Sequence, residues 1–145
     1  MTKKNRKVII TALLAIIPLF FGSKYFNSID VSSDPQVTST IEVLYENRQS
    51  GVMVEFDGLI AKKLSDDNEG SRHQRFIVEL NNRHTVLIAH NIDVAPRVPI
   101  EVNQAVTIYG QYEWNERGGV VHWTHADPHG SHEGGWINFQ GKKYQ

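Results

Sequence analysis

The sequence of 145 residues contains no cysteine. It therefore has no disulfide framework, no thiolate zinc site, no cysteine nucleophile and no lipid-modified cysteine. Any metal would have to be held by nitrogen and oxygen ligands from histidine, aspartate or glutamate. The chain also lacks a glycine-rich phosphate loop, a Gly-x-Ser-x-Gly elbow and a His-Glu-x-x-His motif. These absences argue against nucleotide-binding, serine hydrolase and zincin functions.

The sequence also lacks an excess of either charge, with 15 Lys and Arg against 16 Asp and Glu. This balance hides a split, because residues 1–24 carry five basic and no acidic residues. Subtracting those five leaves 10 basic against 16 acidic residues, a net charge of -6 for the rest of the chain. This charge argues against a globally basic nucleic-acid binder, whereas a local basic patch remains possible. The seven histidines, in contrast, are numerous enough to need an explanation.

The amino terminus has the pattern of a targeting segment. Residues 2–7 are cationic, and residues 8–21 form an almost uninterrupted apolar run. These are the n-region and h-region of a secretory signal peptide. If the segment is not cleaved, residues 8–26 approach the minimum length of a membrane-spanning helix, and the positive-inside rule places the following chain outside the cytoplasm. We therefore expect residues 1–24 to be a signal peptide or inner-membrane anchor of a periplasmic or otherwise extracytoplasmic protein.

A short helix is predicted before the main domain. Residues 25–34 are polar, have no sustained period and are interpreted as a linker. Asp34 and Pro35 then provide an N-cap and a first helical residue, and apolar residues recur at helical spacing up to Gly51. The sequence thus predicts a domain over residues 35–145 that opens with an amphipathic helix.

Beyond Gly51 the apolar residues alternate with a period of two, which is typical of strands. The five predicted strands lie around Val52–Ala61, Phe76–Leu80, Val86–Ile88, Val106–Trp114 and Val120–Thr124. Gly58 indicates a bulge or bend in the long first strand, and residues 115–119 read as a hairpin loop. The expected fold is mainly β, a small five-stranded OB-like Greek-key barrel preceded by the short helix. An SH3-like barrel and an open β-sandwich are the alternatives.

Four of the seven histidines lie within residues 122–132. Neutral imidazoles and a carboxylate at this density could hold a divalent metal such as Zn, Mn, Ni or Mg. The candidate metal ligands are His125, Asp127 and His132. The alternative is that the histidines bond to the backbone and that Asp127 caps a turn before Pro128.

A second polar segment combines arginine and histidine. Guanidinium groups bind phosphate in a bidentate manner, and a histidine can move a proton during phosphodiester cleavage. The residues of this type are Arg72, His73 and Arg75, with Arg97 as a further candidate. The alternative is that the arginines simply pair with the nearby acids Asp66, Asp67 and Glu69 in a solvated loop.

Three aromatic residues could form a stacking platform on the predicted fourth and fifth strands. Tyr112 and Trp114 share strand parity, and Trp123 lies across the hairpin from them. OB folds stack the bases of single-stranded nucleic acids on such platforms. Together with His90, these three residues are the candidate ligand-binding residues. Ordinary core or cross-strand packing is the alternative.

Several of these segments resemble DUF3465, a family of short bacterial proteins of unknown function with an amino-terminal hydrophobic segment. The similar segments are residues 66–76, 89–93, 95–97, 112–115, 118–125, 127–128 and 134–137, followed by Gly141 and Tyr144. The resemblance spans about Val52 to Tyr144. One difference is Ala126, where the family is expected to have histidine, so a site that needs a ligand at this position would lack it. The family name implies no activity.

The leading hypothesis is a domain that binds a polyanion such as nucleic acid and hydrolyses phosphodiesters with metal assistance. The phosphate would be held by Arg72, Arg75 and Arg97. The proton would be moved by His73 or His122. The metal, whose bound water would be the nucleophile, would be held by His125, Asp127 and His132.

Two other hypotheses remain open. The domain could be a non-catalytic envelope module that binds a protein, a glycan or a metal, or it could be a periplasmic metal buffer. No organic cofactor is expected in any of these cases, and the sequence leaves the oligomeric state open.

Overall fold

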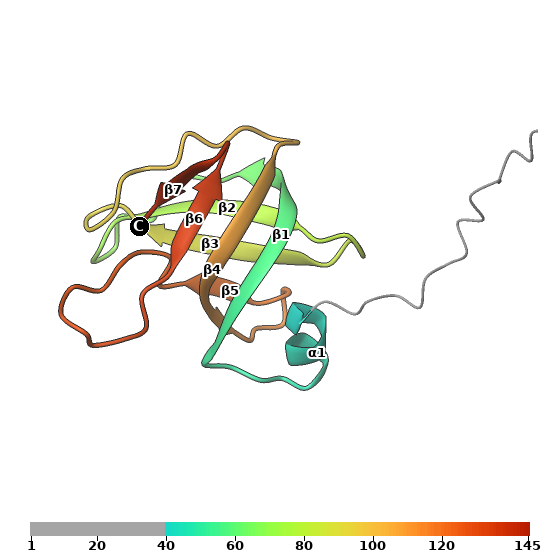
Figure 1. The fold of residues 1–145 in the computed structure, drawn as a ribbon. Coiled ribbons are helices and arrows are strands. Elements are labelled where there is room, and N and C mark those ends of the chain that lie inside the picture. The colour runs from blue at the N-terminus through green and yellow to red at the C-terminus, as the bar shows by residue number, and fades with distance from the viewer. Residues whose placement is uncertain (1–39) are drawn as a thin grey trace, which may run out of the picture. The chain divides into compact units, whose positions relative to one another are not determined.

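The structure is a computed structural model that describes residues 40–145 (Figure 1). The predicted signal or anchor over residues 1–24, the linker over residues 25–34 and the start of the predicted helix lie outside the described residues. Within residues 40–145, no helix is both long and apolar enough to cross a membrane.

The helix α1 spans Thr40–Glu46 and buries Ile41 and Leu44 in the core. It ends well before Gly51, the predicted limit. Arg48 adopts a left-handed φ of 52°, its N–H donates to the carbonyl of Tyr45, and the next N–H donates to the carbonyl of Leu44. This is the hydrogen-bond pattern of a Schellman motif, which terminates a helix.

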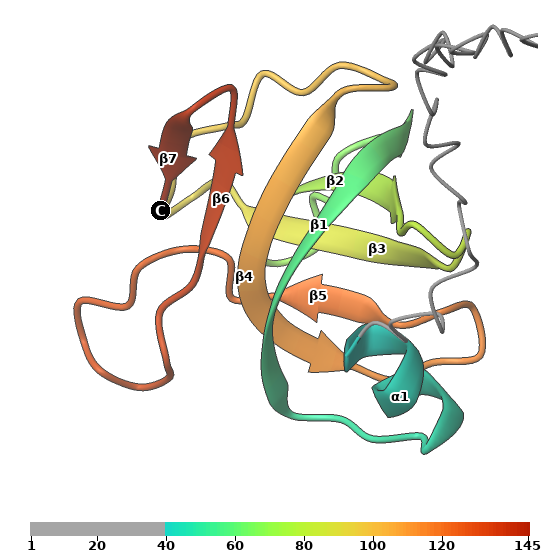
Figure 2. The same ribbon diagram turned by 45° about the vertical axis from the view of Figure 1, so that its right-hand side comes forward.

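Seven strands form one sheet. They are β1 (Val52–Lys63), β2 (His73–Glu79), β3 (Thr85–Asn91), β4 (Ala105–Glu113), β5 (Val120–His122), β6 (Trp136–Phe139) and β7 (Lys142–Tyr144). The first five close on themselves in the order β1-β2-β3-β5-β4-β1, with β3 and β5 parallel and every other pair antiparallel (Figures 1 and 2). The five-stranded OB-like barrel predicted from the sequence is confirmed.

The barrel interior is filled by the alternating apolar residues that predicted the strands. Phe76, Val78, Ile88 and Ile108 are fully buried, while their neighbours in β2, β3 and β4 are partly exposed. The pairing register of β1 with β2 shifts between Ile60 and Lys62, whereas the sequence predicted a bulge or bend at Gly58. The fold needs glycine at position 58 for another reason, because a Cβ there would lie 2.4 Å from Val78 Cγ1.

The hairpin of β6 and β7 was not predicted. β6 pairs with β4 outside the closed barrel, and β7 pairs with β6. The two-residue turn between them consists of Gln140 and Gly141, which both have positive φ, at 51° and 76°. This is the type I′ geometry that suits a two-residue hairpin.

The helix α1 lies at the end of the barrel where β1 begins and β4 ends (Figure 2). Trp114 packs against the core here, and its indole N–H donates to the carbonyl of Tyr45 at 3.1 Å. The rings of Tyr45 and Trp114 are stacked, with their centres 6.3 Å apart. The helix therefore closes one end of the barrel, and the polar residues of interest lie elsewhere.

Gly110→Ala tests the close approach of β4 and β5. A Cβ on Gly110 would lie 2.6 Å from the carbonyl oxygen of His122 and 2.8 Å from Val121 Cγ1. We expect this variant to lose about 2 to 3 kcal/mol of unfolding free energy, because no rotamer relieves a backbone clash. The control is Gly130→Ala, at a left-handed φ of 67° in open space, which should lose only about 1 kcal/mol. Equal losses in urea denaturation would contradict this packing.

Candidate functional site

The regular alternation of β5 breaks at Trp123. This residue has a φ of 52°, which is rare for a bulky side chain and marks a strained position. As a result, His122 and Trp123 are both partly exposed and their rings stack at 4.9 Å, while Thr124 and His125 are both buried. Strand parity therefore does not place His122 and His125 on opposite sides of the sheet, because the strand ends at His122.

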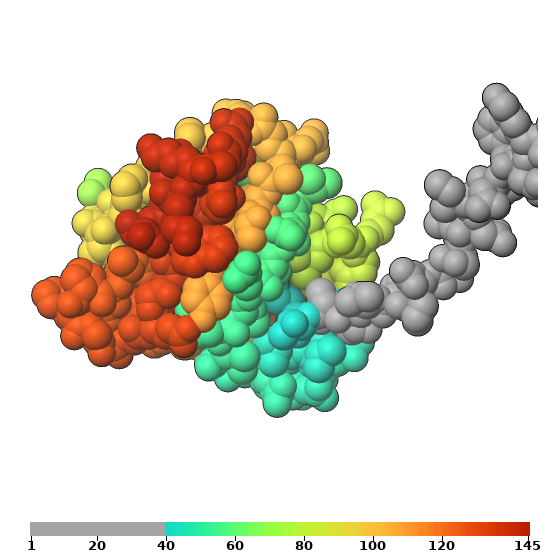
Figure 3. Space-filling view, viewed as in Figure 1, coloured from blue at the N-terminus to red at the C-terminus, as the bar shows by residue number. Residues whose placement is uncertain are grey.

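The rings of this segment form a contiguous group, the histidine stack: His122, Trp123, His132 and His125. Trp123 and His132 are nearly parallel, with an interplanar angle of 8° and ring centres 4.2 Å apart. His132 in turn meets His125 edge to face at 5.2 Å. These residues belong to the end of β5 and to the loop over residues 123–135, which protrudes from the barrel (Figures 1 and 3).

Asp127 organises the loop of the histidine stack. Its carboxylate accepts hydrogen bonds from the Ser131 hydroxyl and from the backbone N–H groups of His129 and His132. These bonds, above all that from Ser131, hold the pKa of Asp127 far below its usual range. The carboxylate caps a turn, as one of the two interpretations of the sequence proposed.

The histidines of this loop bond to the backbone, also as that interpretation proposed. Nδ1 of His125 donates to the carbonyl of Ala126 and Nδ1 of His132 to the carbonyl of Glu133, both at 2.8 Å. Nε2 of His132 lies 3.9 Å from the Asp127 carboxylate. Across residues 40–145, no group of three or more His, Asp or Glu side chains has the arrangement of a metal site, and this includes the predicted set.

His90, a predicted ligand-binding residue, lies inside the protein and bonds to two loops. It is completely buried, and its Nε2 donates to the carbonyl of Pro96 at 3.1 Å. Its Nδ1 therefore accepts from the buried Thr124 hydroxyl at 2.8 Å. Burial lowers the pKa of His90. The neutral ring thus ties the end of β3 to the two loops that follow β3 and β5.

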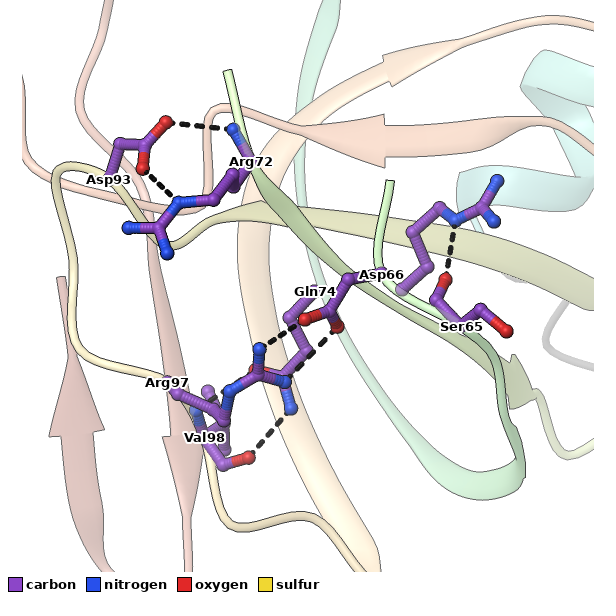
Figure 4. Close-up of polar contacts among 8 residues, drawn as sticks. Ser65, Asp66, Arg72, Gln74, Asp93, Arg97 and Val98 are labelled. Atoms are coloured by element: carbon purple, nitrogen blue, oxygen red, sulfur yellow. Dashed lines mark hydrogen bonds and ion pairs between the residues drawn. The ribbon is translucent and has the colours of Figure 1, made fainter. Parts of the chain in front are cut away.

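The loop over residues 92–104 is also fastened to β2. The buried side chain of Gln74 donates to the carbonyl of Val98 at 2.7 Å and accepts from its N–H at 2.9 Å (Figure 4). These two bonds imitate a strand pairing and satisfy polar groups that would otherwise be costly to bury. The loop is therefore held rigidly beside the amino-terminal end of β2.

Two of the three predicted phosphate-binding arginines are already paired with carboxylates (Figure 4). Arg97 forms a bidentate ion pair with Asp66, which raises the pKa of Arg97 and lowers that of Asp66. Arg72 donates to Asp93 from its backbone N–H at 2.8 Å and from Nε at 2.6 Å, which lowers the pKa of Asp93. Both pairs are exposed, so solvent screens them and they add little to stability. Their role is to join loops.

Arg75 differs from these two arginines. Its Nε donates to the carbonyl of Ser65 at 2.9 Å, but within residues 40–145 its terminal nitrogens have no hydrogen-bond partner. Arg75 and His73 occupy alternate positions of β2 that are partly exposed on the outside of the barrel. They present donors to solvent on this outer face.

His122 belongs to the same outer face. Arg75 pairs with Ala89 of β3, and the partly exposed His122 ends β5, the strand that pairs with β3 on its other side. Nε2 of His122 is buried without a hydrogen-bond partner and lies 3.6 Å from the Glu113 carboxylate. Burial lowers the pKa of His122, and Glu113 partly offsets this effect. We call His73, Arg75 and His122 the basic face.

The structure does not bring the three residues of the predicted aromatic platform together. Tyr112 is fully buried inside the barrel, and Trp114 packs between the core, Tyr45 and the guanidinium of Arg48. Only Trp123 lies beside the basic face, where it stacks with histidines. The residues that sequence reasoning missed are Thr124 and Glu113, the partners of His90 and His122.

The barrel order and the parallel pairing of β3 and β5 place the domain in the class of OB-like barrels. The family model described as "Protein of unknown function (DUF3465)" matches residues 23–145, so the chain belongs to this family. The resemblance found in the sequence is thereby confirmed. The comparison with curated proteins finds none that matches the chain.

His90 predicts a pH dependence of stability. Because its pKa is lower in the folded chain than the usual value of about 6.5, the unfolded chain binds the proton first as the pH falls. We expect the contribution of His90 to the unfolding free energy to be complete above about pH 6.5. It should decrease as the pH falls from there toward the pKa of His90 in the folded chain.

The variant His90→Gln is expected to be less stable at neutral pH, but with a shallower loss between about pH 7 and pH 5. Urea denaturation at several pH values measures both slopes, and equal slopes would contradict this role of His90. A matched control is His129→Gln, an exposed loop residue that should leave the slope unchanged.

Proposed function

We propose that this domain is an OB-type binding module for a phosphate-bearing ligand, such as nucleic acid, which it holds at the basic face. The observation that carries the proposal is the guanidinium of Arg75, whose terminal nitrogens have no hydrogen-bond partner within residues 40–145. A planar guanidinium with free donors binds a phosphate group in a bidentate manner.

The neighbourhood of Arg75 supports an anionic ligand. His73 and His122 supply further ring nitrogens on the same side of the sheet, and the small side chain of Ala89 lies between β2 and β5. The carboxylates of Asp66 and Asp93 are paired with Arg97 and Arg72, while that of Glu113 lies 3.6 Å from Nε2 of His122. A phosphate at the basic face would therefore be held mainly by the terminal donors of Arg75, while the domain as a whole stays acidic.

The ring of Trp123 gives this face an aromatic border. Bases or sugars of a bound strand could contact its edge, although the ring already stacks with His122 and His132. Affinity in this proposal comes mainly from phosphate contacts, which carry little sequence information. The expected ligand is therefore recognised by charge more than by sequence.

The proposed place of action is outside the cytoplasm. The cationic residues 2–7 and the apolar residues 8–21 support a signal peptide or an inner-membrane anchor. The ligand would then be a phosphate-bearing molecule of the envelope or of the medium.

Metal-assisted hydrolysis is the further step that the sequence suggests, with His73 or His122 as the proton-transfer group. Incubation of the full-length chain with single-stranded DNA or RNA, with Mn²⁺ or Zn²⁺ and with EDTA, tests it. Cleavage that EDTA abolishes and that His122→Ala lowers at least tenfold would support hydrolysis. Binding without cleavage under every metal would leave a non-catalytic module.

Arg75→Gln is expected to weaken binding of a short labelled oligonucleotide by about tenfold and to reduce the salt slope by about one. Fluorescence anisotropy at several salt concentrations measures both quantities. The control is Arg83→Gln, an exposed arginine in the turn after β2, which should change affinity less than twofold. Equal effects of the two variants would contradict a localised phosphate contact.

Binding is also expected to strengthen as the pH falls. His122 is neutral at pH 7 because burial lowers its pKa, and it gains a positive charge only in more acidic solution. Oligonucleotide affinity should therefore rise between about pH 7 and pH 5, and His122→Gln should reduce this rise. An affinity that is independent of pH over this range would contradict a contact between His122 and phosphate.

A further inference from the structure

We propose that His125 and His132 form a two-imidazole site for a borderline or soft divalent cation, with Zn²⁺ and Cu²⁺ as the fitting ions. Two ring nitrogens would hold the ion, and water or a bound ligand would complete its coordination. The site differs from the set predicted from the sequence, because Asp127 is not one of its ligands.

The tautomers of the two histidines support this site. A carbonyl oxygen can only accept, so Nδ1 of each ring carries the proton that it donates to Ala126 or Glu133. Nε2 of each ring therefore keeps its lone pair, and neither Nε2 has a hydrogen-bond partner within residues 40–145. A backbone carbonyl on the second nitrogen is how proteins orient metal-binding histidines.

The spacing of the rings also fits. With zinc–nitrogen bonds of about 2.0 Å, two imidazoles on one tetrahedral zinc have ring centres about 5 Å apart. The ring centres of His125 and His132 are 5.2 Å apart, with an interplanar angle of 85°. His125 is 9% exposed as a whole residue and the side chain of His132 is 10% exposed, so both are largely buried and little conformational entropy is lost when an ion binds.

The loop around the pair favours a cation. Residues 123–135 contain two acids and no lysine or arginine. The Asp127 carboxylate lies 3.9 Å from Nε2 of His132, yet it already accepts three hydrogen bonds. Asp127 would therefore stabilise the charge of the ion from outside the coordination sphere. Imidazole nitrogens select Zn²⁺ and Cu²⁺ over Mg²⁺, which prefers oxygen ligands.

The loop is held in place without an ion. The N–H of Gly135 donates to the carbonyl of His125 at 2.9 Å and closes the base of the loop. A Cβ on Gly135 would lie 2.3 Å from the carbonyl oxygens of both Trp123 and Tyr109, so only glycine allows this approach. The stack of His132 on Trp123 then fixes the second ligand. The pair is preorganised.

The test is a titration of the full-length chain, without a histidine tag, with ZnCl₂ and separately with MgCl₂. Calorimetry is expected to show one Zn²⁺ per chain and no Mg²⁺ binding. His125→Ala and His132→Ala should each weaken Zn²⁺ binding at least tenfold. His129→Ala, which removes an exposed histidine from the same loop, is the matched control and should change it less than twofold.

Long-range ¹H–¹⁵N spectra of the unmodified chain provide a readout that does not depend on variants folding. Zn²⁺ should shift Nε2 of His125 and His132 while their Nδ1 protons remain. No binding, binding that survives the double variant, or shifts at other histidines would overturn the proposal. Because no oligonucleotide is present, the outcome is independent of the proposed phosphate binding.

Discussion

The candidate site depends on one backbone conformation, the left-handed φ of Trp123. Such a conformation costs a non-glycine residue about 1 to 2 kcal/mol, so the surrounding structure must enforce it. The hydrogen bond between Thr124 and the fully buried His90 does so from one side, and the close approach of Gly135 does so from the other. With an ordinary strand φ, Trp123 would face away from His122, and the histidine stack would not form.

Buried polar residues hold the loops of this domain in position, while its exposed ion pairs contribute little to stability. Gln74 and His90 bond to the loop after β3 from inside the protein, and leaving either partner unpaired would cost several times the energy of a surface ion pair. The arginine pairs lie at the surface above these anchors. This rigid frame leaves the terminal nitrogens of Arg75 and Nε2 of His122, His125 and His132 without hydrogen-bond partners within residues 40–145, and these are the groups available to bind a ligand.

The sequence predicted the barrel well because alternation of apolar residues reports which face of a strand is buried. It missed β6 and β7, which are too short for alternation to show, although Gln140-Gly141 is a turn signal in retrospect. The functional residues were harder to predict. Strand parity placed Tyr112 and Trp114 together, but one faces the barrel interior and the other packs against Tyr45 of α1. The pairing of Arg97 with Asp66, and the conformation of Trp123, follow from tertiary contacts that no local pattern reports.

We propose that the outer face of β2 and β5 is the ligand-binding surface of this domain. Amide and side-chain chemical shifts of the full-length chain, recorded during titration with a short single-stranded oligonucleotide, test it most directly. We predict that the largest changes cluster at His73, Arg75, Ala89 and His122 and fade with added salt. Changes confined to α1 and the neighbouring barrel end, or no changes at all, would contradict it.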